Sequence, residues 1–95
     1  MSSILHITQA APVLHGVIKL TWDDGYEGVV DLRPIIAEGE IFEPLRDPQR
    51  FSAVQVSEYG HSIYWLDDEG DEVDFGCDRL RELAERQAAL LKLAG

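Results

Sequence analysis

Apolar and polar residues alternate in the first third of the chain in the way that is typical of a β-hairpin. Alternation from residue 17 to 22 resumes from 26 to 32, and Asp23-Asp24-Gly25 lies between the two runs. These three residues suit a hairpin loop with Gly25 in the left-handed conformation. Such a loop keeps the apolar side chains on one face, through the opposed pairs Trp22–Tyr26, Leu20–Gly28 and Ile18–Val30. We therefore predict a three-residue loop.

Further alternating runs predict more strands. We expect a strand at Leu5–Ala10 that ends before Pro12, because proline cannot donate a ladder hydrogen bond. A second hairpin with an added strand follows: Val54 and Val56 face Ile63 and Trp65 across a turn with Tyr59 and Gly60, and Val73 and Phe75 lie beyond a loop at residues 67–71.

The alternation stops between Pro34 and Phe51, where four prolines and glycines favour short helical turns. Pro34 suits the first position of one turn, with Asp31 as a capping acceptor. Asp47 can cap a second turn that begins at Pro48.

Helical spacing appears at the end of the chain, in Leu80, Leu83, Ala84, Ala88, Leu90 and Leu91. We predict an amphipathic helix with Asp78 as N-cap and an ion pair between Glu82 and Arg86. Its apolar stripe should pack on the sheet. The chain then reads as a single α+β domain over residues 1–95: hairpins of five to six mostly antiparallel strands, short helical turns in the middle, and one C-terminal helix.

Charge narrows the functions that the chain can have. Eight Lys and Arg against eighteen Asp and Glu give a formal charge of −10, which disfavours nucleic acid and anionic membranes as partners. From Phe51 to Asp78 there is no Lys or Arg, whereas there are eight carboxylates including Asp78 itself, so one end of the molecule should be strongly negative. The single cysteine and the absence of a signal-peptide pattern lead us to expect a cytoplasmic protein.

Candidate chemistry is sparse. The acidic residues 67–72 lack the spacing of a calcium loop, and we interpret them as a solvated turn. Cys77 precedes a helix, where a thiol can be activated, but no base is placed beside it by the sequence, so a structural cysteine is favoured. The three histidines lie in separate segments without a metal-binding spacing. We predict no catalytic, cofactor-binding or metal-binding residues.

The chain resembles a family of small prokaryotic domains of unknown function, DUF2442. The resemblance rests on Asp24-Gly25, Asp31-Leu32, Phe42, Pro44-Leu45, Phe51, Val54, Val56, Gly60, Trp65, Val73-Asp74 and Leu80. It implies an α+β fold and supplies no catalytic residues. Genes of the family tend to lie beside another small gene, in a manner similar to toxin–antitoxin pairs.

The leading hypothesis is a non-enzymatic protein-binding module whose acidic end docks a basic protein partner, in the form of the neutralising half of a toxin–antitoxin-like pair. The predicted partner-binding residues are Tyr59, Tyr64, Asp67, Asp68, Glu69, Asp71 and Glu72. A small-molecule-binding or enzymatic domain with a cleft between helix and sheet is the alternative. A homo-oligomer built through exposed strand edges is a third hypothesis.

Overall fold

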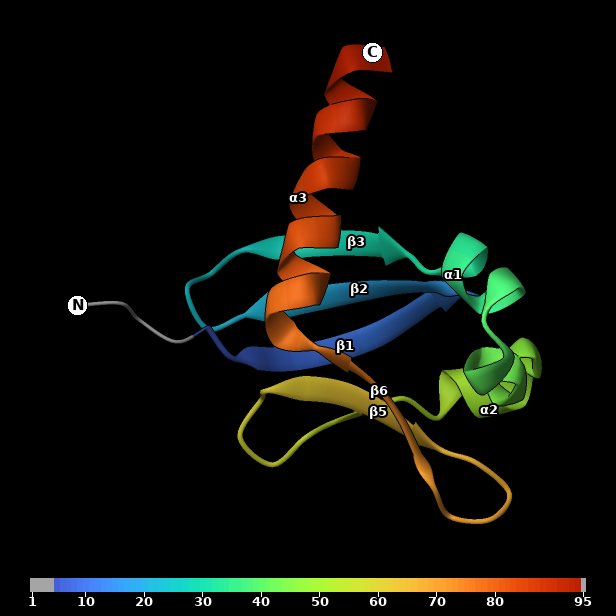
Figure 1. Cartoon of the computed structure of the whole chain (residues 1–95). Helices are drawn as coiled ribbons and strands as arrows, with labels where there is room; N and C mark the ends of the chain where they lie inside the picture. Colours follow the sequence, from blue (N-terminus) through green and yellow to red (C-terminus); the bar gives the residue numbers. More distant parts are fainter. Residues whose placement is uncertain (1–4, 95) are drawn as a thin grey trace.

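The computed structural model describes the backbone of residues 5–94 and the side chains of residues 5–90, and its α+β class is the one predicted (Figure 1). One antiparallel sheet has the order β1-β2-β3 and the other β4-β5-β6. The strands are β1 (Ile7–Leu14), β2 (Val17–Trp22), β3 (Glu27–Asp31), β4 (Gln55–Val56), β5 (Ser62–Leu66) and β6 (Glu72–Gly76). The helices are α1 (Arg33–Glu38), the 3-10 helix η1 (Glu40–Arg46), α2 (Pro48–Ser52) and α3 (Cys77–Ala94).

The first hairpin has the predicted loop and register. Ile18 pairs with Val30 and Leu20 with Gly28, and the amide of Trp22 donates to the Tyr26 carbonyl at 2.9 Å. Gly25 has a φ of +90°, in the left-handed region that favours glycine. The alternation of apolar residues therefore determined both the face and the pairing.

The prediction for the first strand was wrong at both ends. Strand β1 begins at Ile7 and continues through Pro12 to Leu14. It lies at the edge of its sheet, and the pairing with β2 shifts register just after Pro12. Proline is tolerated at an edge or an irregularity because its missing N–H leaves no inner ladder bond unmade.

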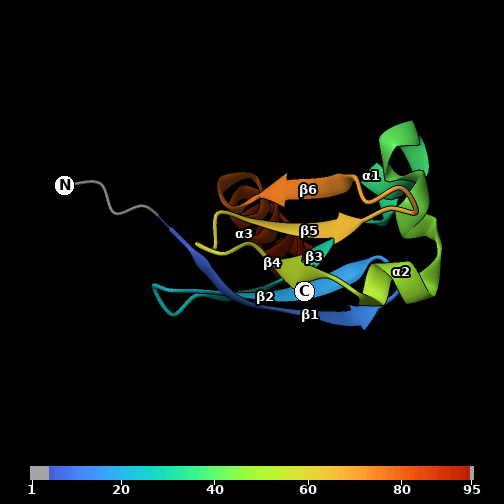
Figure 2. The same cartoon turned by 90° about the horizontal axis from the view of Figure 1, so that it is seen from below.

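The second sheet pairs Val56 with Ile63, as predicted, and Ile63 and Trp65 with β6. Strand β4 is only two residues long. The indole N–H of the buried Trp65 donates to the Phe51 carbonyl at 2.7 Å, which joins this sheet to α2. Figure 2 shows the two sheets as separate layers, with α1 and α2 together at one end.

The middle segment is helical, as predicted. Asp47 caps α2 by accepting from the Gln49 amide at 3.3 Å, and the Asp31 carboxylate accepts from the Arg33 amide at 3.0 Å. Helix α1 begins at Arg33, one residue earlier than expected. In η1, Phe42 and Leu45 are both buried, because residues three apart share a face of a 3-10 helix.

The last helix departs from the prediction at its start and along its second half. It begins at Cys77, directly after β6, so Asp78 lies in the first turn and is not the N-cap. The predicted ion pair between Glu82 and Arg86 does form, at 2.9 Å. Leu80 and Ala84 are buried, whereas Ala88 and Leu90 are exposed, and the side chain of Leu91 lies outside the described residues.

Sheet width explains why the apolar stripe is only half covered. Eighteen residues of helix span about 27 Å, whereas three strands span roughly 10 Å between their outer axes. Helix α3 therefore passes beyond β3 (Figure 1). As it does so, the Gln87 amide bonds both backbone groups of Asp31, accepting from its N–H at 2.8 Å and donating to its carbonyl at 3.2 Å. Part of the β3 edge is thus protected.

Candidate functional site

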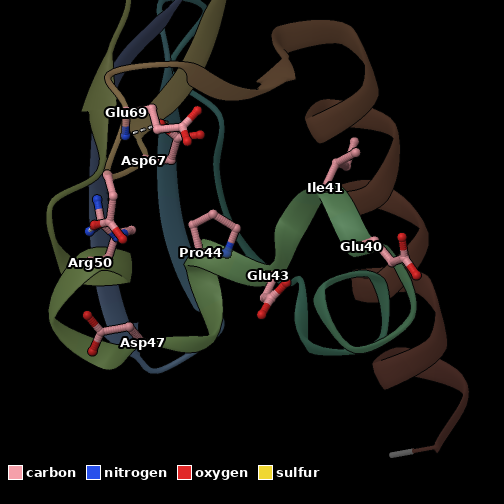
Figure 3. A pocket seen from close by; sticks show the side chains of 9 residues that line it. Glu40, Ile41, Glu43, Pro44, Asp47, Arg50, Asp67 and Glu69 are labelled. Atoms are coloured by element: carbon pink, nitrogen blue, oxygen red, sulfur yellow. Dashed lines mark hydrogen bonds and ion pairs between the residues drawn. The ribbon is translucent and has the colours of Figure 1, made fainter.

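A groove with a volume of about 650 Å³ lies between the η1–α2 segment and the loop that joins β5 to β6 (Figure 3). We call it the acidic groove. It is lined by Glu40, Ile41, Glu43, Pro44, Asp47, Arg50, Asp67, Asp68 and Glu69.

Negative charge dominates this surface. Six carboxylates and one guanidinium line the groove, which leaves an excess of five negative charges at neutral pH. The guanidinium belongs to Arg50, which donates to the Leu66 carbonyl at 2.6 Å and forms an ion pair with Asp68. Arg50 therefore ties α2 to the end of β5, while most of the carboxylates face solvent without a cation.

The loop between β5 and β6 is shaped by its own first residue. The Asp67 carboxylate accepts from the amides of Glu69 at 2.9 Å and Asp71 at 2.8 Å, and Gly70 has a φ of +85°. The role of Asp67 is therefore conformational. It leaves the carboxylates of Asp68 and Glu69 at the exposed tip of the loop.

Ile41 is the exception to the polar lining. Its side chain is 72% exposed on η1, among carboxylates. It also lines a second hollow of about 310 Å³, together with Phe42, Asp67, Glu72, Val73 and Asp74. An apolar residue thus lies where the two hollows meet, within a strongly negative surface.

The structure gathers only part of the predicted partner-binding set. Asp68 and Glu69 line the acidic groove with Asp67, and Glu72 lines the adjoining hollow, while Asp71 is exposed in the same loop. The five carboxylates therefore do form one end of the molecule.

The two predicted tyrosines lie away from that groove. Tyr59 is 69% exposed in the turn before β5, at the opposite end of this strand from the acidic loop, and its ring lies 6.2 Å from that of His61. Tyr64 is half-buried and faces away from the core, where its hydroxyl donates to Gln55 Oε1 at 3.1 Å. Neither tyrosine lines the groove, although Tyr64 pairs across the strands with Asp74, two residues from Glu72 on the same face of β6. The role of both tyrosines as contacts stays a prediction.

Sequence reasoning missed the other wall of the groove. Glu40, Glu43 and Asp47 come from the irregular middle segment, at least twenty residues before the acidic loop. The available signal was the recurrence of carboxylates in that segment. It carried no information about which face of the molecule the segment would occupy.

The remaining candidates for chemistry are Cys77 and the three histidines. Cys77 is buried, its thiol donates to the Leu5 carbonyl at 3.2 Å, and burial raises its pKa. The rings of His6 and His61 lie 5.1 Å apart, whereas His15 bonds the Leu45 carbonyl through Nε2 at 2.9 Å. Within residues 5–94, no group of three or more His, Cys, Asp or Glu side chains is placed to hold a metal ion.

Comparison with known proteins adds a family. The model of a family described as a protein of unknown function (DUF2442) matches residues 12–85. No curated protein and no solved structure matches the chain significantly. In the part of the chain described, no helix has both the length and the apolar character needed to cross a membrane.

Proposed function

Because the chain belongs to the DUF2442 family, whose description assigns no activity, we propose from its surface that it is a non-enzymatic protein-binding module for a basic partner. The observation that carries the proposal is the acidic groove, with six carboxylates, one guanidinium and the exposed Ile41. Carboxylates at a rim steer a basic surface into contact, and an exposed apolar residue supplies area that becomes buried on binding.

The concrete form that we propose is the neutralising member of a toxin–antitoxin-like pair, in which the partner is a basic protein. The groove suits this role because it recognises charge and a single apolar contact, without the positioned acids and bases that a reaction needs. Phe75 and Leu80 are buried beneath the first half of α3, and a hollow of about 270 Å³ lies beside Ala84, between the helix and β3. The charged residues of this hollow, Lys19 and Glu27, pair with each other at 3.6 Å, so it supports the enzymatic alternative less than the acidic groove supports binding.

Affinity purification of the tagged chain from the cells in which it occurs, at low salt, tests the proposal. We expect a basic protein to co-purify in stoichiometric amount and to be released as salt is raised, because screening shortens the range of charge attraction from about 30 Å at 0.01 M to about 8 Å at 0.15 M. With that partner purified, calorimetry then measures its dissociation constant.

A matched pair of variants tests the position of the binding surface. Glu40→Gln, Glu43→Gln and Glu69→Gln together remove three groove charges, and at about 0.5 kcal/mol each this weakens binding about tenfold. Glu27→Gln, Glu58→Gln and Glu82→Gln change the net charge equally but lie outside the groove. Equal weakening by both triple variants, or a complex insensitive to salt, would contradict the proposal.

Ile41→Ser separates contact from charge. Because the side chain is 72% exposed, the free energy of unfolding should stay within about 0.5 kcal/mol of the wild-type value. Partner affinity should nevertheless fall at every salt concentration, since lost apolar contact is not screened. Wild-type affinity in this variant would remove Ile41 from the interface.

A further inference from the structure

A third hollow, of about 430 Å³, shares no lining residue with the acidic groove. It is lined by His15 and Gly16 from the turn between β1 and β2, by Arg33, Ile36 and Ala37 from α1, and by Arg46 from the end of η1. We call it the basic hollow. Its volume is within the range of small-molecule sites, about 300 to 1,000 Å³. On a chain of net charge −10, the charged side chains that line this hollow are two arginines, of which Arg33 is paired with Asp31.

Arg46 is held rigidly at this hollow by backbone carbonyls. Its Nε and Nη2 both donate to the Ile36 carbonyl at 3.1 Å, and Nη2 also reaches the carbonyls of Ala37 at 3.3 Å and Gly39 at 3.4 Å. Its partners among residues 5–90 are thus neutral, and no carboxylate there lies within ion-pair distance. Nη1 takes no part in these bonds. The guanidinium therefore has no carboxylate partner among these residues, and the two N–H groups of Nη1 are free to donate.

Arg33 is the second fixed cation of the hollow. Its Nε and Nη2 donate to the two oxygens of Asp31, each at 2.9 Å, which leaves Nη1 outside the pair. The stem of Arg33 packs against Gly16, where a Cβ would collide with Arg33 Cγ and where φ is +89°. A glycine is thus required in the turn so that the stem can lie there. The hydrogen bond from His15 Nε2 to the Leu45 carbonyl fixes the imidazole on the same wall.

Between these polar groups, the surface of the hollow is mainly apolar. Ile36 and Ala37 are the apolar side chains that line it. We propose that the basic hollow binds a small organic anion: a carboxylate attached to a short apolar body. The carboxylate takes the free N–H groups of Arg46, whose charge is otherwise unmatched, with Arg33 Nη1 as a further donor. A carboxylate suits these remaining donors because hydrogen bonds between two charged groups are stronger than those between neutral groups. The apolar body covers Ala37 and Ile36.

Titration of the whole chain with butyrate, observed by two-dimensional NMR of the backbone amides and the arginine Nε–H groups, tests this assignment. We expect saturable shifts at Gly16, Ala37 and Arg46. Affinity should rise from acetate to butyrate by about fourfold for each methylene that enters the hollow, which is the equivalent of about 0.8 kcal/mol. Butylammonium, with the same body and the opposite charge, should not shift these three signals.

Ala37→Glu is the variant of choice, because it adds a negative charge at an exposed lining position and leaves both arginine anchors in place. We expect it to weaken butyrate binding at least tenfold. Ala89→Glu makes the same change on the exposed surface of α3 and should leave binding unchanged. Arg46→Lys keeps the charge but loses the planar set of donors, and should weaken butyrate binding while the unshifted spectrum elsewhere reports that the fold is intact.

Three results would overturn the proposal: no saturable shift at the basic hollow with any carboxylate, equal binding of butylammonium, or binding of inorganic phosphate with no gain from acetate to butyrate. Equal butyrate affinity in Ala37→Glu and wild type would also overturn it. The signals followed are those of the basic hollow, which shares no lining residue with the acidic groove, so the outcome is independent of the test for a basic protein partner.

Discussion

The acidic groove and the basic hollow share one short element and hold their charges in opposite ways. Residues from the first part of η1, Glu40 to Pro44, line the groove, while Arg46 at its end lines the hollow. Phe42 and Leu45 are buried between them. In the groove most charges are exposed and unpaired by cations, whereas in the hollow each guanidinium is fixed by two or more acceptors.

This difference separates two kinds of recognition. Exposed, loosely held charges act over several ångströms, tolerate many geometries and are weakened by salt. Fixed donors beside an apolar wall act at contact distance and select shape. A single 3-10 helix can serve both because its period of three residues places every third side chain in the core and leaves the others on the surface.

Leu45→Ala would disrupt both surfaces together. The side chain is fully buried, and removing it should lower the free energy of unfolding by about 2 to 5 kcal/mol, since a cavity is left beneath η1. Urea denaturation measures the change. Ile41→Ala, on the exposed side of the same helix, is the control and should lie within about 0.5 kcal/mol of wild type. A small effect of Leu45→Ala would show that η1 does not depend on this anchor.

Asp67→Ala should distinguish the conformational carboxylate of the groove from the exposed ones. Its two accepted backbone bonds are lost, so we expect a destabilisation of about 1 kcal/mol. Glu69→Ala, in the same loop, loses no such bond and should be close to neutral. Thermal denaturation of the two variants side by side measures the difference, and equal stabilities would contradict the role assigned to Asp67.

Arg33→Gln should have the smallest effect, and that effect should depend on pH. The hydrogen bond from the Arg33 guanidinium holds the pKa of Asp31 below its usual value of 3.8, although partial burial opposes this. The pair therefore stabilises the fold at pH values above 3.8. Its contribution is lost as the pH falls through the lower pKa that Asp31 has in the folded state. Because the pair is partly exposed, solvent screening keeps its contribution small at neutral pH.

Urea denaturation of wild type and Arg33→Gln across a pH series checks this. The two curves of stability should converge on the acidic side of pH 3.8. A difference that stayed constant into acid would mean that Arg33 acts through packing on Gly16 and not through the Asp31 carboxylate.

Local patterns predicted those parts of the fold that local physics determines. The alternation around Gly25 determined a hairpin and its register, because a slip of one residue would move every apolar side chain to solvent. The cap at Asp47 followed from residue type alone. The path of β1 through Pro12 could not be read in this way, because only the position of the strand at a sheet edge makes proline acceptable there.

The candidate sites depended on packing between distant segments. The sequence located the negative end at residues 67–72, but its second wall, from Glu40 to Asp47, joined it only through the docking of η1 and α2 on the sheets. Tyr59 and the acidic loop are close in sequence and lie at opposite ends of β5, since an extended strand separates its ends.

By itself, then, the sequence determined where apolar and polar residues alternate, where apolar residues repeat with helical spacing, where short helical turns occur, and that the net charge is negative. The tertiary structure alone decided that η1 contributes to two surfaces of opposite charge and that α3 extends past its sheet. The physical reason is range. Backbone preference and side-chain periodicity act over a few neighbouring residues, whereas a groove is made by segments that meet only when the shared core of Phe42, Leu45, Phe51 and Trp65 is buried.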